Sequence, residues 1–172
     1  MTKIKGKKIK LGIVGGGSGS WIGHVHRIAA RFDNQYEIVS GVFSRNFKNS
    51  SKFGQSLGID KNRCYSNYKE MANKEAKRTD GIDVVAIMTP PGSHQAIAET
   101  FINKNINIIS DKPFAGNLNQ AKSLFKKIKS NKKKSIKFFI PLLRNKLNEK
   151  KRSFIKFSTF ELNKSVKTKI ME

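Results

Sequence analysis

Residues 9–32 read IKLGIVGGGSGSWIGHVHRIAARF, and this stretch decides the fold. Its first six residues are mostly apolar and β-branched, as in a buried strand of a parallel sheet. Glycines and serines at 15–20 then break any regular pattern, and from residue 22 to residue 32 apolar side chains recur at helical spacing. The order of strand, glycine turn and helix predicts an anion site, because free backbone N–H groups and a helix N-terminus converge at such a turn.

Strands and helices continue to alternate along the chain. Further strands are predicted at 36–43, 63–65, 81–88, 106–110 and 136–140. Helices are predicted at 47–57, closed by Gly58, at 67–72, at 93–104 and after Asn117, which stands in the capping-box relation to Gln120. This alternation predicts an α/β fold, a Rossmann-like, doubly wound, mostly parallel sheet with helices on both faces. We expect one nucleotide-binding domain over 1–140, and at 141–172 a poorly specified basic tail without periodicity.

The charge of the chain invites a nucleic-acid interpretation. The formal net charge is +23, from 35 basic and 12 acidic residues in a chain of 172. Most of the basic residues are lysine rather than the arginine that favours base and phosphate recognition, and the excess is strongest after residue 121. Many lysines, asparagines and isoleucines are also what A/T-rich codons produce. Nucleic acid is therefore not expected as a partner, although the charge alone does not decide the matter.

The sequence also indicates a cellular compartment. No apolar run approaches the roughly 18 residues needed to cross a bilayer. The basic start is followed by only four apolar-type residues before the glycines, too few for a signal peptide. The single cysteine, Cys64, cannot form an internal disulfide. We expect a cytoplasmic protein with no membrane partner, and we predict no metal site.

The glycine turn supplies the first candidate cofactor-binding residues. They share the approach from the strand to the helix N-terminus: Gly15, Gly17, Gly19, Ser20, Trp21 and Ile22. Glycines allow a pyrophosphate to approach the backbone closely. The spacing departs from the usual G-x-G-x-x-G, because Ser20 stands where the last glycine is expected and the next glycine is Gly23. A flexible turn with no ligand is the alternative.

The end of the second strand bears on the choice between NAD and NADP. NAD enzymes usually present an Asp or Glu here to the ribose 2′-hydroxyl. This chain presents Ser44 and Arg45, which leaves room for a 2′-phosphate and a cation to pair with it. A preference for NADP follows only weakly, since Arg45 is equally consistent with a solvated surface charge.

Two later strand ends complete the candidate site. Thr89 and Pro90 follow the strand 81–88, with His94 close behind, and Asp111, Lys112 and Pro113 follow the strand 106–110. Carboxyl ends of parallel strands face the ligand crevice, so Lys112 is the candidate catalytic residue. The alternatives are a plain surface turn at 111–113 and, for His94, a surface histidine at a helix N-terminus.

Taken together, these residues resemble the Gfo/Idh/MocA family of sugar and inositol dehydrogenases. The motifs are the loop from Gly15 to Gly23 leading into 25–27, then 80–83, Thr89-Pro90, His94 and Asp111-Lys112-Pro113, and the resemblance covers roughly 8–135. It implies a two-domain NAD- or NADP-dependent oxidoreductase that moves hydride between nicotinamide C4 and a sugar hydroxyl carbon. It also implies that Lys112 contacts the nicotinamide ribose and the substrate hydroxyl, while a second domain supplies a histidine base.

Residues 141–172 do not match the family's crossover into that second domain. We hypothesise a truncated or frameshifted gene product that binds a dinucleotide with little or no dehydrogenase turnover. A sugar or polyol partner is expected only if a second domain is supplied, and an exposed apolar face makes self-association possible. The alternatives are a non-catalytic NAD(P)-binding module, or a retired Rossmann domain with a basic nucleic-acid-binding tail.

Overall fold

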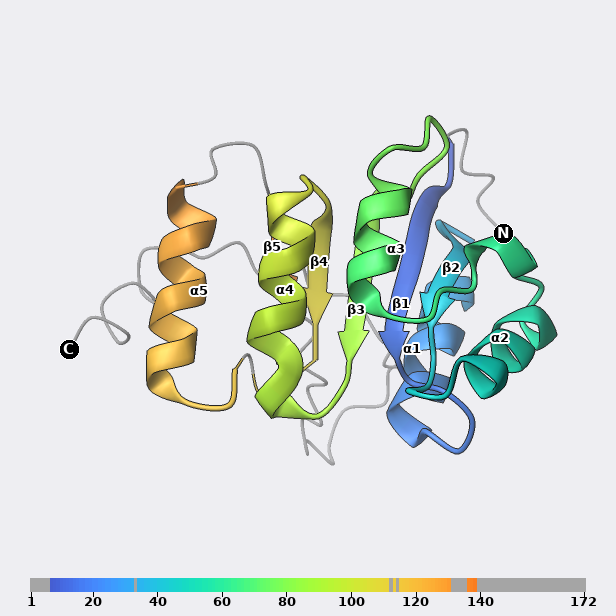
Figure 1. The fold of residues 1–172 in the computed structure, drawn as a ribbon, viewed down its shortest axis with the longest axis horizontal. Helices are drawn as coiled ribbons and strands as arrows, with labels where there is room; N and C mark the ends of the chain where they lie inside the picture. The colour runs from blue at the N-terminus through green and yellow to red at the C-terminus, as the bar shows by residue number, and fades with distance from the viewer. Residues whose placement is uncertain (1–6, 33, 112, 114, 131–135, 139–172) are drawn as a thin grey trace, which may run out of the picture.

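The computed structural model describes residues 7–32, 34–111, 113, 115–130 and 136–138. Within them, the strands are β1 (Ile9–Gly15), β2 (Tyr36–Val42), β3 (Val84–Met88), β4 (Asn107–Ser110) and β5 (Ile136–Phe138). The α-helices are α1 (Trp21–Phe32), α2 (Phe47–Ser56), α3 (Tyr68–Glu75), α4 (His94–Asn103) and α5 (Leu118–Ser130) (Figure 1). Two 3₁₀ helices lie between them, at Lys61–Arg63 and Pro91–Ser93.

The strands form one sheet in the order β2-β1-β3-β4-β5, and every neighbouring pair is parallel. The chain leaves β1 for β2 on one side, then returns past β1 to place β3 on the other side. This reversal makes the carboxyl ends of β1 and β3 the place where a doubly wound sheet binds its ligand. The predicted fold class is confirmed.

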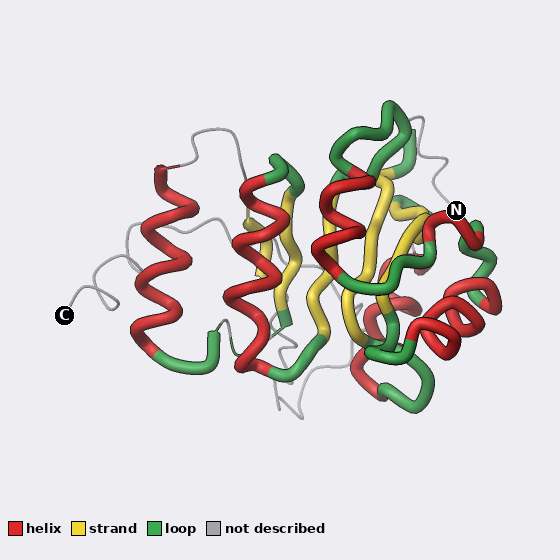
Figure 2. The backbone as a smooth tube through the Cα atoms, in the orientation of Figure 1, coloured by secondary structure: helices red, strands yellow, loops and turns green. Residues whose placement is uncertain are grey.

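Both faces of the sheet are covered, as the alternation of side chains along each strand requires. In β3, Val85 and Ile87 pack into a cluster with residues of α3, α4 and α5, whereas Val84 and Ala86 pack into a second cluster on the side of α1 and α2. Figure 1 shows α3, α4 and α5 in a row over one face, and Figure 2 shows helices on either side of the strands.

One predicted strand and one predicted helix need correction. The strand expected at 63–65 is a single parallel bridge between Gly41 and Cys64, because Arg63 belongs to a 3₁₀ helix and cannot pair with the sheet. The helix expected at 67–72 runs instead from Tyr68 to Glu75.

Two of the predicted helix-end signals are confirmed. Gln120 N donates to the Asn117 side chain at 2.9 Å, so Asn117 caps α5, and the Gln120 side chain accepts from Gly116 N at 2.9 Å, one residue earlier than in the usual capping box. Gly58 follows α2 with a φ of +84°, the left-handed conformation that ends a helix.

The residues after 138 lie outside the described part of the chain, so the end of the strand expected at 136–140 and the tail at 141–172 stay predictions. In the described residues, the structure contains no helix that combines the length and the apolar character needed to span a bilayer.

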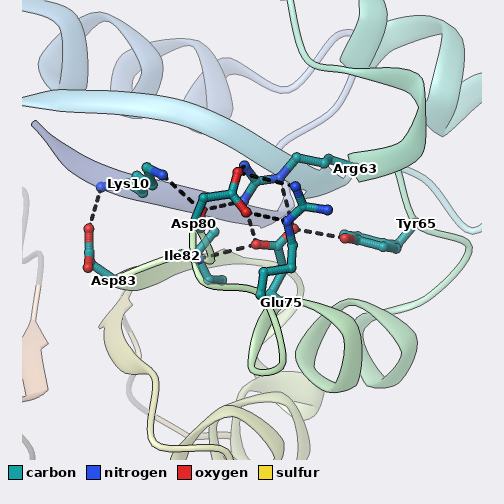
Figure 3. A network of polar contacts seen from close by, with 8 residues as sticks. Lys10, Arg63, Tyr65, Glu75, Asp80, Ile82 and Asp83 are labelled. Carbon is teal, nitrogen blue, oxygen red and sulfur yellow. Dashed lines mark hydrogen bonds and ion pairs between the residues drawn. The ribbon is translucent and has the colours of Figure 1, made fainter.

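A buried ionic network ties α3 to the rest of the domain (Figure 3). The Glu75 carboxylate, whose side chain is 0% exposed, accepts from Arg63 Nε at 3.0 Å and from Arg63 Nη2 at 2.5 Å. It also accepts from the Tyr65 hydroxyl at 2.8 Å and from Ile82 N at 3.2 Å. Burial, followed by the hydrogen bond to Glu75, raises the pKa of the Tyr65 phenol. Each lone pair of the buried carboxylate is thereby engaged by a donor.

This network lies at the amino-terminal edge of the sheet. Lys10, near the start of β1, donates from its backbone N to Asp83 at 2.8 Å and from Nζ to the carbonyl oxygen of Asp80 at 3.0 Å. Asp80 and Asp83 both precede β3. The ionic groups therefore support the edge opposite to the strand ends where a ligand is expected.

Substituting Glu75→Gln is expected to lower the free energy of unfolding by about 3–5 kcal/mol, because it leaves the Arg63 guanidinium buried without its charged partner. Glu70→Gln on the same helix is the matched control. Glu70 pairs with Lys74 on the surface and has a pKa held near 2, chiefly by its hydrogen bond with Lys74, yet an exposed pair contributes only about 0–1 kcal/mol. Urea unfolding measures both. Equal losses in the two variants would contradict a stabilising role for the buried network.

Candidate functional site

The candidate site is the crevice at the carboxyl ends of β1 and β3. The two strands are neighbours up to their last residues, since Gly15 pairs with Met88. The turn that follows β1 and the turn that follows β3 therefore start side by side. A Cβ built on Gly15 would lie 3.0 Å from the Thr89 methyl group. Predicted residues from two separate motifs are brought together here.

The glycine turn packs its backbone directly against α1. A Cβ on Gly23 would lie 2.3 Å from the carbonyl oxygen of Gly16 and 2.5 Å from its Cα. Ser20 stands before the helix, and its hydroxyl accepts from Gly23 N at 3.1 Å. Gly23 thus performs the close packing that the usual motif assigns to the glycine three residues earlier, and Ser20 acts as the helix cap.

A second close approach joins the glycine turn to the end of β2. A Cβ on Gly17 would lie 2.2 Å from the carbonyl oxygen of Phe43. Phe43 N is fixed in turn by the hydroxyl of the buried Ser50 at 2.8 Å. Ser44 and Arg45, which follow Phe43, are consequently held beside the glycine turn, as a dinucleotide that reaches from pyrophosphate to ribose requires.

The end of β2 leads directly into α2. Asn46 caps this helix by accepting from Asn49 N at 3.1 Å, and the Ser44 hydroxyl accepts from Asn46 N at 3.2 Å. Arg45 is exposed. The cap leaves a cationic side chain next to a helix N-terminus, and both favour an anionic group.

Arg27 of α1 supports the glycine turn through a hydrogen bond to its backbone. The sequence alone did not identify it as a site residue. Its guanidinium donates to the carbonyl oxygen of Gly16 at 2.5 Å and lies 5.1 Å from the centre of the Phe53 ring. Burial, and then the neighbouring charge of Arg31, lower the pKa of Arg27. Its position in the sequence could have indicated burial, because helical spacing places Arg27 on the same face of α1 as the buried Gly23 and Ala30.

The turns after β3 and β4 meet through His94. The Ser93 hydroxyl donates to Thr89 Oγ1 at 2.8 Å, which fixes the first turn. The His94 ring lies between the carbonyl oxygens of Thr89, 2.6 Å from Nε2, and Pro113, 2.9 Å from Nδ1. His94 is 1% exposed, so the alternative of a surface histidine is wrong. The buried ring therefore contacts a residue of each turn.

Asp111 is half-buried at the end of β4, where its N donates to the carbonyl oxygen of Ile87 at 3.1 Å. Its negative charge also acts on His26 of α1: burial lowers the pKa of His26, and Asp111 opposes that shift. Lys112 lies outside the described residues, so its catalytic role stays a prediction.

The remaining predicted site residues lie at the start of α1 and in the turn after β3. Trp21 is 72% exposed and Ile22 is partly buried beside the cluster of α1 and α2. Gly19 and Pro90 lie in the two turns themselves. Nowhere in the described part of the chain do three or more metal-ligating side chains gather into a group that could hold a metal ion.

Comparison with known proteins agrees with this geometry. A sequence model described as "Oxidoreductase family, NAD-binding Rossmann fold", that of Gfo/Idh/MocA, matches residues 9–138. An uncharacterized oxidoreductase of Bacillus subtilis, YfiI, is 40% identical over 112 residues, which cover 64% of this chain and 28% of YfiI. The chain thus spans little more than a quarter of that curated relative.

Solved structures show the same likeness. An oxidoreductase from Sinorhizobium meliloti is 44% identical with a TM-score of 0.71, covering 77% of this chain and 36% of its own. An inositol dehydrogenase homolog from Azotobacter vinelandii, complexed with NADH and myo-inositol, is 33% identical with a TM-score of 0.73, covering 77% of this chain and 35% of its own.

Substituting Gly23→Ala is expected to destabilise the domain by about 1–3 kcal/mol, because the added methyl group meets backbone atoms of Gly16 that cannot rotate away. This cost exceeds the gain of up to about 1 kcal/mol that alanine brings to a helix interior. Gly92→Ala is the control, since a Cβ there meets nothing within 4 Å. Urea unfolding of both variants checks the prediction, and a Gly23→Ala domain as stable as the wild type would contradict it.

Proposed function

Because the chain belongs to the Gfo/Idh/MocA family of oxidoreductases and carries its NAD-binding Rossmann domain, we propose that residues 15–23 hold the pyrophosphate of the dinucleotide. The observation that carries this proposal is the contact between the backbones of Gly16 and Gly23. It brings the glycine turn onto the N-terminus of α1, a helix of 12 residues, with no side chain between them. A pyrophosphate needs that close backbone approach and the positive end of the helix dipole.

Ser44 and Arg45 are proposed to face the adenosine ribose. Gly17 contacts the carbonyl oxygen of the residue before Ser44, so the ribose end and the pyrophosphate end of the site adjoin each other. No carboxylate occupies the place where one would bind a 2′-hydroxyl and repel a 2′-phosphate, and Arg45 supplies a cation. These features favour NADP over NAD.

The nicotinamide is proposed to lie between the turns after β3 and β4. Thr89, Pro90, Asp111 and Pro113 form these turns, and the family resemblance adds Lys112 as the residue that contacts the nicotinamide ribose and the substrate hydroxyl. The bound cofactor would supply a hydride acceptor or donor at C4 of its nicotinamide. The described residues would bind and orient it, and Lys112 would move the hydroxyl proton.

The substrate class is proposed to be a sugar or polyol. A second domain would hold it, and such a domain would account for the greater length of the relatives. Hydride transfer needs the reacting carbon held against the nicotinamide and a base for the hydroxyl proton. The described residues of this chain provide the cofactor half of that arrangement. These residues are therefore proposed to bind dinucleotide in the cytoplasm, and turnover is proposed to need a substrate domain as well.

The proposed site predicts saturable binding of NADH and NADPH in about 0.5 M salt, where screening confines charge attraction to a few ångström. Arg45→Ala is expected to weaken NADPH binding about tenfold, close to 1.4 kcal/mol, with NADH affinity unchanged. Arg31→Ala removes the same charge from the far end of α1 and serves as the control. Fluorescence titration measures each affinity. Binding that disappears with salt would overturn the proposed site, and equal losses for both cofactors would overturn the role of Arg45.

The purified chain is expected to show no steady reduction of NAD or NADP with polyols, myo-inositol included, because hydride transfer also needs a domain that holds the polyol against the nicotinamide. Absorbance of the reduced nicotinamide measures the rate, with the enzyme-free mixture as the control. A sustained polyol-dependent rate would show that this chain completes an active site by itself.

A further inference from the structure

His94 is the buried side chain whose environment the binding of a dinucleotide does not by itself explain. It begins α4, it is 1% exposed, and both nitrogens of its ring face backbone carbonyl oxygens. One oxygen belongs to Thr89, in the turn after β3, and the other belongs to Pro113, in the turn after β4. The ring therefore spans the gap between the two turns at the nicotinamide end of the proposed site.

The chemistry of the two contacts selects one form of the ring. A carbonyl oxygen can only accept a hydrogen bond. A neutral imidazole donates from one nitrogen and accepts at the other, whereas an imidazolium donates from both. At 2.6 and 2.9 Å, both separations are hydrogen-bond distances, so two donated bonds require a proton on each nitrogen.

We propose that His94 is a positioning residue: with both ring nitrogens protonated, it holds the turn that carries Pro113 against the turn that carries Thr89. Its effect on the cofactor rests on the function proposed above. A side chain that lacks these two donors would leave both carbonyl oxygens without their partner, and the two turns would no longer be joined by the two bonds. The nicotinamide end of the site then becomes looser.

The charged groups described around His94 have other partners, so the contacts that define its role are those with the two carbonyl oxygens. The described turn after β3, residues 89–93, carries no charged side chain. Glu99, further along α4, is engaged by Lys127 of α5 and by Gln95. Asp111 is the charged group on the described part of the turn after β4, and its charge acts on His26. The Ser93 hydroxyl bonds to Thr89 within the turn after β3, and Asp111 N bonds to Ile87 of β3. Each turn therefore has its own contacts, and His94 sets the spacing between the two turns.

The protonation of the ring can be tested on the full chain without cofactor. The chain has three histidines, so a long-range proton–nitrogen spectrum of their rings is readily assigned, and His94→Gln identifies the His94 signals by their loss. We expect two protonated nitrogens on His94, because two donated bonds to carbonyl oxygens require them. A spectrum in which one His94 nitrogen carries no proton would overturn the proposed doubly bonded form.

The positioning role is tested by NADH titration of His94→Gln and His94→Phe. Glutamine keeps one donor, and phenylalanine keeps the shape of the ring with none. We expect NADH affinity to fall about tenfold in the phenylalanine variant and less in the glutamine variant. Thr100→Ala is the control on the same helix, because the Thr100 hydroxyl donates within α4, to the Ala96 carbonyl oxygen, and it should change affinity less than about twofold. Circular dichroism verifies that each variant is folded.

The comparison of the two variants separates positioning from mere packing. Phenylalanine fills the space of the ring without a donor, so an affinity that falls in His94→Phe and is partly kept in His94→Gln follows the donors and not the shape. A folded phenylalanine variant with wild-type affinity would overturn the proposal. Failure of the wild type to bind NADH in high salt would instead overturn the proposed function, and the ring spectrum would still decide the state of His94.

Discussion

The contact between the backbones of Gly16 and Gly23 is the constraint on which the ligand edge of this domain depends. Once two backbones approach this closely, the distance between β1 and the start of α1 is fixed. Other contacts then follow from it. Arg27, one turn further along α1, comes within reach of the Gly16 carbonyl oxygen, and its guanidinium lies against Phe53 of α2. The glycine turn is thus braced by both helices on its face of the sheet.

The two edges of the sheet are stabilised by different kinds of interaction. At the amino-terminal edge, charged side chains are buried and fully engaged around Glu75. At the carboxyl-terminal edge, the main contacts join backbone atoms to one another or to the side chains of Arg27, Ser50 and His94. This division keeps the buried pair of Arg63 and Glu75 away from the edge at which the N-terminus of α1 suits an anionic ligand.

Much of the fold could be predicted because its determinants are local. The apolar run at 9–14, the glycines after it and the capping pair Asn117 and Gln120 each act within a few residues of the chain. The strand expected at 63–65 failed because its length depends on a partner strand, and Gly41 offers Cys64 a single bridge.

The candidate site was predictable as a set of turns but not in its internal contacts. The family resemblance grouped Thr89, His94 and Pro113, yet the burial of His94 arises from a contact 19 residues away along the chain. Arg27 and Glu75 were missed for a related reason. A charged residue on a helix is usually solvated, and only tertiary partners such as Gly16 or Arg63 justify its burial.

The single bridge between Gly41 and Cys64 also affects whether another polypeptide can add a strand to this edge of the sheet. A long, flat outer strand would offer a row of unpaired backbone groups to any extended peptide. Here Cys64 pairs with Gly41 at the outer side of β2 and is itself buried. The side chain of Glu37 adds an exposed charge to the same strand. Short contacts and charged residues are what proteins use to discourage the addition of a foreign strand. The bridge at Gly41 and the charge of Glu37 therefore discourage a foreign strand from pairing with these two parts of β2.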